Sequence, residues 1–271
     1  MTELKKVHSF FASWNYVEKG FEDILCDLRS DTPEMSAKAG LINESSGKKV
    51  WHLVRKNRNG IAYDFAYKIN PGKTPWRYIF KSSLAAREAE NYMMFEQLNI
   101  PTAHVLAAGD IRKNFILKEN FIATRFIGGS HDGRIFMPGG EMRAETELRK
   151  EFTCKHLSLL AEIHDNMIFH KAFHPRNLLW RNSGNGMEIF WIDVARCRRV
   201  KSWAMKRAIL VDIHTFFRDM RPPESELREC VAYYLAQRRN GTYPGGADAL
   251  IQDVFGFRRR LFSKKRYIVC E

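Results

Sequence analysis

The sequence predicts an α+β protein with an antiparallel sheet in its first half and mainly helices in its second half. Large apolar residues alternate with small or polar residues over 61–69, which is typical of a strand with one buried face. In the second half, Leu157, Leu160, Ala161 and His164 lie on one row of a helix. Glycine pairs at 128–129 and 139–140 separate these patterns, so we expect two lobes, 1–128 and 129–271.

The composition excludes several classes of protein. The 271 residues are 45% apolar and 28% charged, which is ordinary for a globular protein and argues against long disorder. The sequence has no apolar run near the roughly 18 residues that span a bilayer, and no secretory signal is expected in 1–11. The five cysteines form no C-x-x-C motif, so we expect reduced thiols in a cytoplasmic protein without structural zinc.

Further elements follow from local patterns. In the first lobe we expect strands at 51–54, 61–69, 105–108, 115–117 and 121–126, and one helix at 82–98 that stops before a proline. In the second lobe we expect a hairpin turned by 182–186 and helices at 141–164, 204–220, 225–238 and 247–257.

Three residues with a fixed spacing carry the strongest chemical signal. Asn177 follows His170 by seven residues, and Asp193 follows Asn177 by sixteen, at the end of an apolar run. This order is typical of a kinase catalytic loop and the strand after it, where the Asn and the Asp bind the magnesium ions on the nucleotide phosphates. One position departs from the pattern, because Ala172 stands where H-R-D has a carboxylate.

A second motif lies in the first lobe. Ala66 and Lys68 match an A-x-K strand, in which the lysine binds phosphates and the small residue makes room for the base. Glu88 shares a helical row with Tyr92 and Phe95, so we expect it to face inward and pair with the lysine. Glu90 is the second candidate for that pair. Thr124 and Phe126 complete the residues expected to bind the nucleotide.

The remaining polar residues of the loop have other expected roles. His170 is expected to brace the loop through hydrogen bonds. His174 lies on the same loop and is a candidate substitute base near the substrate, and Asp165, which precedes the loop, is a weaker one. Asp212 fits a buried acid that binds backbone N–H groups of the loop.

The charge predicts an anionic partner. Lys and Arg outnumber Asp and Glu by 44 to 31, giving a net charge of +13, and the cations cluster at 196–207 and 258–266. The segment 255–268 mixes aromatic and basic residues, so we expect it to dock on an anionic membrane. A nucleic-acid partner is not expected, because neither cluster lies in a recognisable reader motif.

These stretches together resemble the bacterial lipopolysaccharide core kinase family, which includes heptose and Kdo kinases and InaA-like relatives. The resemblance covers about residues 48–220 and rests on 66–68, 87–88, 98–102, 170–179 and 192–196. It implies a two-lobed protein-kinase-like fold, ATP with magnesium as cofactors, and a phosphotransferase. The implied acceptor is a sugar hydroxyl of a lipid-linked glycan, the lipopolysaccharide core, at the cytoplasmic face of the inner membrane.

A second interpretation stays open. The alanine at position 172 removes the expected catalytic carboxylate, and InaA-like members of the family also depart from H-R-D. The alternative is therefore a pseudokinase, a nucleotide-binding regulator without turnover.

Overall fold

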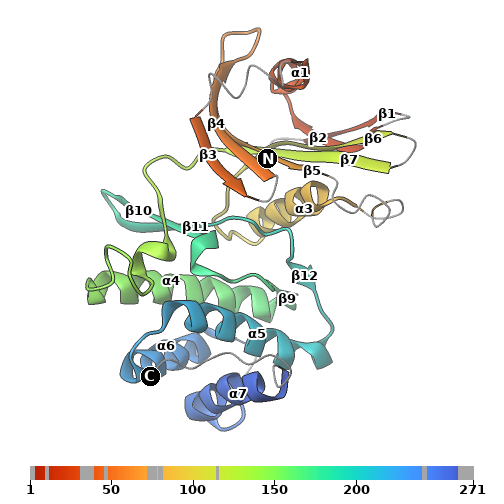
Figure 1. Cartoon of the computed structure of the whole chain (residues 1–271). Helices are drawn as coiled ribbons and strands as arrows, with labels where there is room; N and C mark the ends of the chain where they lie inside the picture. The colour runs from red at the N-terminus through yellow and green to blue at the C-terminus, as the bar shows by residue number, and fades with distance from the viewer. Residues whose placement is uncertain are drawn as a thin grey trace. The chain divides into compact units, whose positions relative to one another are not determined.

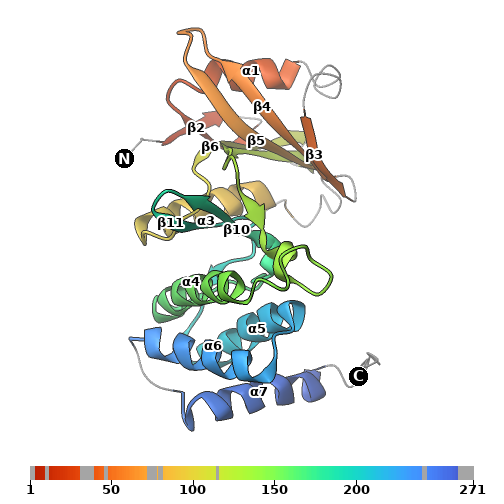
Figure 2. The ribbon, with the colours of Figure 1, turned by 90° about the vertical axis from the view of Figure 1, so that its left-hand side faces the viewer.

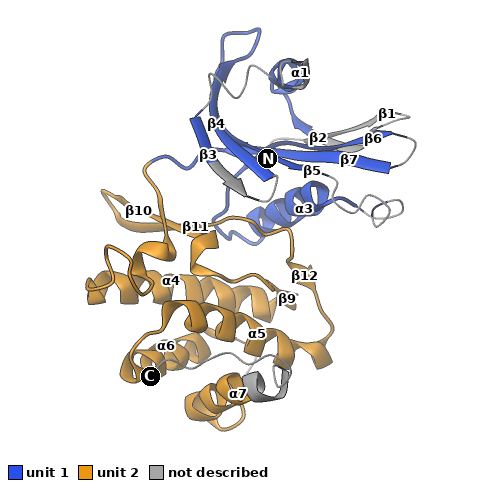
Figure 3. Ribbon diagram, viewed as in Figure 1, with its two compact units in different colours: residues 1–128 blue, residues 129–271 orange. Residues whose placement is uncertain are grey.

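The computed structural model describes residues 4–9, 12–30, 40–45, 48–71, 78, 82–113, 116–239 and 243–261. The chain divides into two compact units, Met1–Gly128 and Gly129–Glu271 (Figures 1 and 3). The first holds an antiparallel sheet and the second is mainly helical, so the predicted fold class is confirmed.

Among the described residues, seven strands of the first unit form one antiparallel sheet in the order β1-β2-β6-β7-β5-β4-β3. The separate strands expected at 115–117 and 121–126 are wrong, because one strand crosses both ranges. Asn120 lies inside it, where its Oδ1 accepts hydrogen bonds from Asn70 Nδ2 and Ala85 N, both at 3.2 Å. A polar residue that is satisfied in this way does not break a strand. The bounds are β1 (Leu4–Ser9), β2 (Ala12–Glu18), β3 (Gly40–Ser45), β4 (Lys48–Lys56), β5 (Ala62–Pro71), β6 (Val105–Lys113) and β7 (Ile116–Arg125).

Helices cover both faces of this sheet (Figure 1). We expected one helix, α3 (Leu84–Gln97), and the structure adds α1 (Glu22–Ser30) on the opposite face. Ile24, Leu25 and Leu28 of α1 pack in one apolar core with side chains of β5. Since β5 alternates, the residues that do not face this core point to the side of α3. The strand register therefore decides which residues of β5 are available for a ligand.

The second unit is built on helices α4 (Thr146–Asp165), α5 (Ser202–Met220), α6 (Glu224–Gln237) and α7 (Gly246–Leu261) (Figure 2). Helix α4 begins at Thr146 and not at the expected 141, because 141–144 form turns, with Glu145 N–H donating to Met142 O at 3.2 Å. A buried ion pair joins α4 to α6, with Arg149 Nη2 2.6 Å from Glu226 Oε2.

Short strands connect these helices. The hairpin β10 (Leu178–Ser183) and β11 (Gly186–Trp191) forms a sheet with β8 (His131–Asp132), which leads into the 3-10 turn η2 (Gly133–Phe136). Strand β9 (Ile168–Phe169) pairs with β12 (Arg198–Arg199), so the chain after Asp193 returns beside the start of the loop 170–177. That loop contains the 3-10 turn η3 (Pro175–Asn177).

No helix in the described part of the chain is long and apolar enough to cross a membrane. Of the segment expected to dock on a membrane, residues 262–268 lie outside the described residues.

Candidate active site

The candidate functional residues form two groups, one in each unit. In the first unit, β5 presents Lys68 toward α3, and its Nζ lies 2.9 and 3.1 Å from the two carboxylate oxygens of Glu88. Tyr92 also donates to Glu88, whose side chain is only 4% exposed. Glu90 instead accepts a hydrogen bond from the Tyr16 hydroxyl on the exposed side of the helix. The sheet and helix therefore hold Lys68 in one position by a two-pronged ion pair.

The neighbouring positions on the same face of the sheet form the second part of this group. Ala66 pairs with Thr124 on β7 and with His52 on β4. The His52 ring stacks on Phe126 with centroids 3.8 Å apart and an interplanar angle of 18°. His52 Nε2 also lies 2.5 Å from Asp64 Oδ1. His52 belongs to no sequence motif, and only the register of three strands brings it to Phe126.

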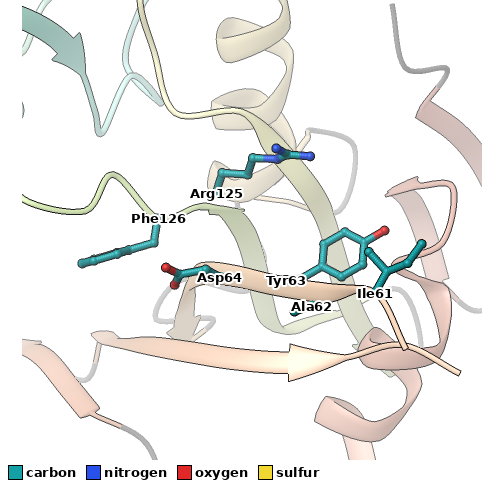
Figure 4. Close-up of a pocket in the computed structure, with 6 residues that line it drawn as sticks. All are labelled: Ile61, Ala62, Tyr63, Asp64, Arg125 and Phe126. Atoms are coloured by element: carbon teal, nitrogen blue, oxygen red, sulfur yellow. The ribbon is translucent and has the colours of Figure 1, made fainter. Parts of the chain in front are cut away.

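A pocket of about 330 Å³ opens at the ends of β5 and β7 (Figure 4). It does not include Lys68 or Glu88, so it lies away from the expected phosphate position. Its lining residues are Ile61, Ala62, Tyr63, Asp64, Arg125 and Phe126.

In the second unit, the hairpin β10–β11 brings Asn177 and Asp193 close together. Leu178 pairs with Trp191, and the backbone N–H of Ile192 donates to Asn177 O at 2.9 Å. Asn177 and Ile192 are therefore neighbours at the open end of the hairpin, and Asp193 is the next residue. It has a positive φ of 54°, which turns the chain out of the strand direction.

The amide of Asn177 is oriented for a cation. Its Nδ2 donates to Ala172 O at 3.0 Å, and its Oδ1 accepts no hydrogen bond from the described residues. An amide oxygen and a carboxylate are hard ligands of the kind magnesium prefers, and protein sites for this ion use one or two carboxylates with phosphates and water. The described residues contain no cluster of three His, Cys, Asp or Glu that would hold a metal by itself. The pair thus fits magnesium that is bound together with a nucleotide.

Asp212 fixes the backbone of the loop from α5. Its two carboxylate oxygens accept the N–H groups of His170 at 2.9 Å and Lys171 at 2.8 Å. Lys171 has a positive φ of 65°, which an L-residue adopts at a cost, and the hydrogen bond to Asp212 holds it there. The structure therefore shows the contact expected of Asp212.

A buried chain of hydrogen bonds reaches Asp212 from α6. Tyr234 Oη lies 2.7 Å from His164 Nδ1, and His164 Nε2 lies 3.2 Å from Asp212 Oδ2. Arg238 donates to the Tyr234 hydroxyl at 3.1 Å and also pairs with Asp165 at 2.6 Å. Asp165 is thereby engaged in an ion pair behind the loop.

His170 is buried and neutral. Burial lowers its pKa to about 4, even though the nearby Asp212 acts to raise it. Its Nδ1 accepts the N–H of Ala172 at 3.3 Å, so the ring braces the turn of the loop. Ala172 itself is only 6% exposed.

His174 forms a pair with a carboxylate that the sequence analysis did not single out. Its Nδ1 lies 2.7 Å from Asp219 Oδ2, while its Nε2 makes no hydrogen bond with a described residue. Partial burial acts to raise the pKa of Asp219, but hydrogen bonds from His174 and Arg218 outweigh burial and lower the pKa below its ordinary value. Whenever the imidazole is neutral, an ionised Asp219 favours the tautomer with the proton on Nδ1 and the lone pair on Nε2.

Comparison with known proteins identifies the family. A family model described as "Lipopolysaccharide kinase (Kdo/WaaP) family" matches residues 63–234. The chain belongs to this family. The predicted resemblance is confirmed, and the matched range includes Lys68, Glu88 and the loop with Asp212. Since this is a family of kinases, ATP is the expected phosphoryl donor.

Comparison with solved structures supports the fold. The structure titled "WaaP in complex with acyl carrier protein" matches with a TM-score of 0.59 and 13% identity, over 92% of this chain and 98% of that chain. At this identity the match shows the fold alone. A Rio2 kinase–ADP/Mg²⁺–phosphoaspartate complex from Chaetomium thermophilum matches with a TM-score of 0.41 and 11% identity, over 98% of this chain and 68% of that chain. No curated protein matches the sequence significantly.

Proposed function

We propose that this Kdo/WaaP-family protein transfers a phosphoryl group from ATP to a hydroxyl of a lipid-linked sugar, such as the lipopolysaccharide core. Family membership supports the reaction class. The observation that carries the proposal is the open end of the hairpin β10–β11, where Asn177 with its oriented amide oxygen adjoins Asp193. The proposed place of the reaction is the cytoplasmic face of the inner membrane, where ATP meets a lipid-linked acceptor.

The residues of the first unit would bind the nucleotide. Lys68, oriented by Glu88, would bind the phosphates as a fixed cation. Ala66 and Thr124 would contact the base, with Phe126 as an aromatic surface beside them. Ala66 and Lys68 alternate with Phe65 and Tyr67 of the apolar core, so they face the other side of the sheet.

The residues of the second unit would hold magnesium that is bound to nucleotide phosphates. Asn177 Oδ1 and the carboxylate of Asp193 would be its protein ligands. Magnesium bound there supplies charge neutralisation on the transferred phosphate. His170 and Asp212 would keep the loop in this geometry without contacting the reactants.

The base is proposed to be His174. Phosphoryl transfer passes through a loose transition state, so the acceptor hydroxyl needs positioning more than strong activation. His174 Nε2 would accept the hydroxyl proton, while Asp219 holds the ring and stabilises the imidazolium that forms. This pair would take over from the missing carboxylate at Ala172.

Nucleotide binding is the first test. With ATP at 100 times its Kd, binding should raise the free energy of unfolding by about 2.7 kcal/mol, seen as a magnesium-dependent thermal shift. The shift should be lost in Asp193→Ala and kept in Asp248→Ala, which removes an exposed carboxylate from α7 that pairs with Arg228. The proposal fails if the wild-type protein shows no magnesium-dependent shift with ATP.

A pseudokinase is the second candidate, and the burial of the Ala172 methyl group is the observation that favours it. A phosphorylation assay with core oligosaccharide acceptors separates the two. Turnover by the wild-type protein that falls by about 10²–10⁴-fold in His174→Ala, with ATP binding unchanged, supports the kinase with a substitute base. Tight Mg-ATP binding without product, in the wild type and in Ala172→Asp, supports the pseudokinase.

A further inference from the structure

The segment between Asp193 and α5 carries a run of cations with no acidic residue. From position 194 to position 211 the sequence holds six Lys and Arg residues and no Asp or Glu. Five of them, Arg196, Arg198, Arg199, Lys201 and Arg207, are exposed and form no ion pair with any described residue. Lys206 differs, because it pairs with Asp253 of α7 at 3.1 Å. Unpaired cations at this density make a strongly positive surface.

The largest exposed apolar side chain of the described residues lies within this run. Trp203, in the first turn of α5, is 81% exposed. Arg199 and Lys201 are two residues apart in an extended stretch that leads directly to it, and Arg207 is one helical turn further on. Met167 is 36% exposed and adjoins the same stretch, since its carbonyl accepts the N–H of Val200 at 2.8 Å. We call Met167, Arg199, Lys201, Trp203 and Arg207 the Trp203 surface.

This exposure sets Trp203 apart from the other tryptophans that the structure describes in the second unit. The other tryptophans of the second unit, Trp180 and Trp191, are 4% and 0% exposed and pack against other rings. An indole that is 81% exposed loses most of the stabilisation that its burial would give. Indole rings flanked by Lys and Arg are the side chains found at the interface between water and a bilayer.

We propose that the Trp203 surface binds an anionic lipid bilayer, with the indole in the headgroup region and the cations on lipid phosphates. Charge complementarity favours this partner, since the run 194–211 contributes no Asp or Glu and five of its six cations form no ion pair with a described residue. One protruding indole at the end of a helix suits insertion. Binding of single-stranded nucleic acid uses several aromatic rings in a groove instead. Vesicle binding can be measured without nucleotide, so the inference does not depend on the proposed phosphotransfer.

The cations of the Trp203 surface should dominate its affinity for an anionic bilayer. Each basic residue near an anionic surface strengthens binding roughly fivefold. The triple variant Arg199→Gln/Lys201→Gln/Arg207→Gln should therefore lower the partition coefficient on phosphatidylglycerol vesicles on the order of 100-fold. The matched control is Arg55→Gln/Lys56→Gln/Arg58→Gln, which removes the same charge from exposed positions of the first unit and should change binding far less.

The indole provides a second readout. Lipids brominated near the headgroup should quench the tryptophan fluorescence of the full chain, and most of that quenching should disappear in Trp203→Phe. Tyr233→Ala, which removes an aromatic side chain 36% exposed on α6, is the control and should leave vesicle binding intact.

Three results would overturn the proposal. The first is a wild-type protein that does not sediment with phosphatidylglycerol vesicles. The second is wild-type affinity and wild-type quenching in Trp203→Phe and in the triple variant. The third is loss of oligonucleotide binding in these variants with no effect on vesicles, which would assign the surface to nucleic acid.

Discussion

Asp212→Asn should destabilise the protein by removing the acceptor that fixes the catalytic loop. Asp212 is fully buried, and its oxygens accept hydrogen bonds from His170 N, Lys171 N and the ring of His164. An asparagine has only one acceptor oxygen. Its amide nitrogen would therefore face either the N–H of Lys171 or the two groups at Oδ2, which are the N–H of His170 and the ring of His164. At least one buried N–H is then left without an acceptor.

The cost follows from these contacts. A hydrogen bond to a charged group contributes about 1.5–3 kcal/mol, and an unpaired buried N–H costs about 1–3 kcal/mol. Because asparagine is neutral, the variant does not have the desolvation cost of a buried charge, and this offsets part of the loss. We therefore expect the free energy of unfolding to fall by about 2–4 kcal/mol. Urea denaturation followed by circular dichroism measures it. Magnesium-dependent ATP binding should weaken as well, because the released loop carries Asn177.

Asp219→Asn is the matched control, since it makes the same chemical change on the same helix. Asp219 contacts His174 and Arg218 near the surface and accepts no loop N–H among the described residues. Its loss should cost less than about 1 kcal/mol of stability. Equal stability of Asp212→Asn and the wild type would refute the assignment of Asp212 as the group that fixes the loop.

Two further predictions concern the other titratable groups. Glu88→Gln should weaken ATP binding by about tenfold, because a neutral partner no longer orients Lys68, whereas Glu90→Gln should leave calorimetric binding unchanged. Burial lowers the pKa of His170 to about 4 and that of His156 to about 3, while the unfolded chain protonates both near pH ~6.5. Their contribution to stability is therefore complete above pH ~6.5 and falls as the pH drops toward 4, by about 1.4 kcal/mol per histidine and pH unit. Burial also lowers the pKa of His164, so this third histidine adds to the fall. Urea unfolding at pH 7 and 5.5 should show the fall, and His156→Gln should remove the share of one histidine. If the free energy of unfolding of His156→Gln falls between pH 7 and 5.5 as much as that of the wild type, His156 does not contribute to the pH dependence.

Several parts of the site were predictable because they depend on local sequence. Glu88 shares a helical row with buried Tyr92 and Phe95, and this periodicity alone favoured it over Glu90. Asn177 and Asp193 are joined by a short hairpin whose turn residues are visible in the sequence. In both cases a few residues of regular structure fix the relative positions.

Other parts depend on contacts that the local sequence does not encode. The stack of His52 on Phe126 requires β4, β5 and β7 to pair in one register, and that register is set by the whole sheet. The helix α1 had a readable signal in the spacing of Ile24, Leu25 and Leu28, but nine residues are too few to stand out beside the strands around them.

Asp219 is an intermediate case. Its spacing from Asp212 in the sequence is informative, but only once the position of Asp212 in the fold is known. It lies seven residues after Asp212, so the two carboxylates share one face of α5 two turns apart. Once Asp212 is assigned to the start of the loop, at His170, the next carboxylate on that face is expected to lie near a later loop residue. The structure places it at His174.

The position of Asp219 beside His174 suggests a replacement for the carboxylate that is missing at position 172. If His174 with Asp219 replaces it, Asp219→Asn should lower kcat on the order of 10²-fold in the wild-type background, because the imidazole loses its orientation and its counter-charge. The same substitution should matter much less beside Ala172→Asp, where the loop has its own acceptor for the hydroxyl proton. A double-mutant cycle on kcat therefore reports whether the two carboxylates serve one step. Equal losses in both backgrounds would mean that Asp219 acts independently of position 172, and the role of His174 as substitute base would have to be abandoned.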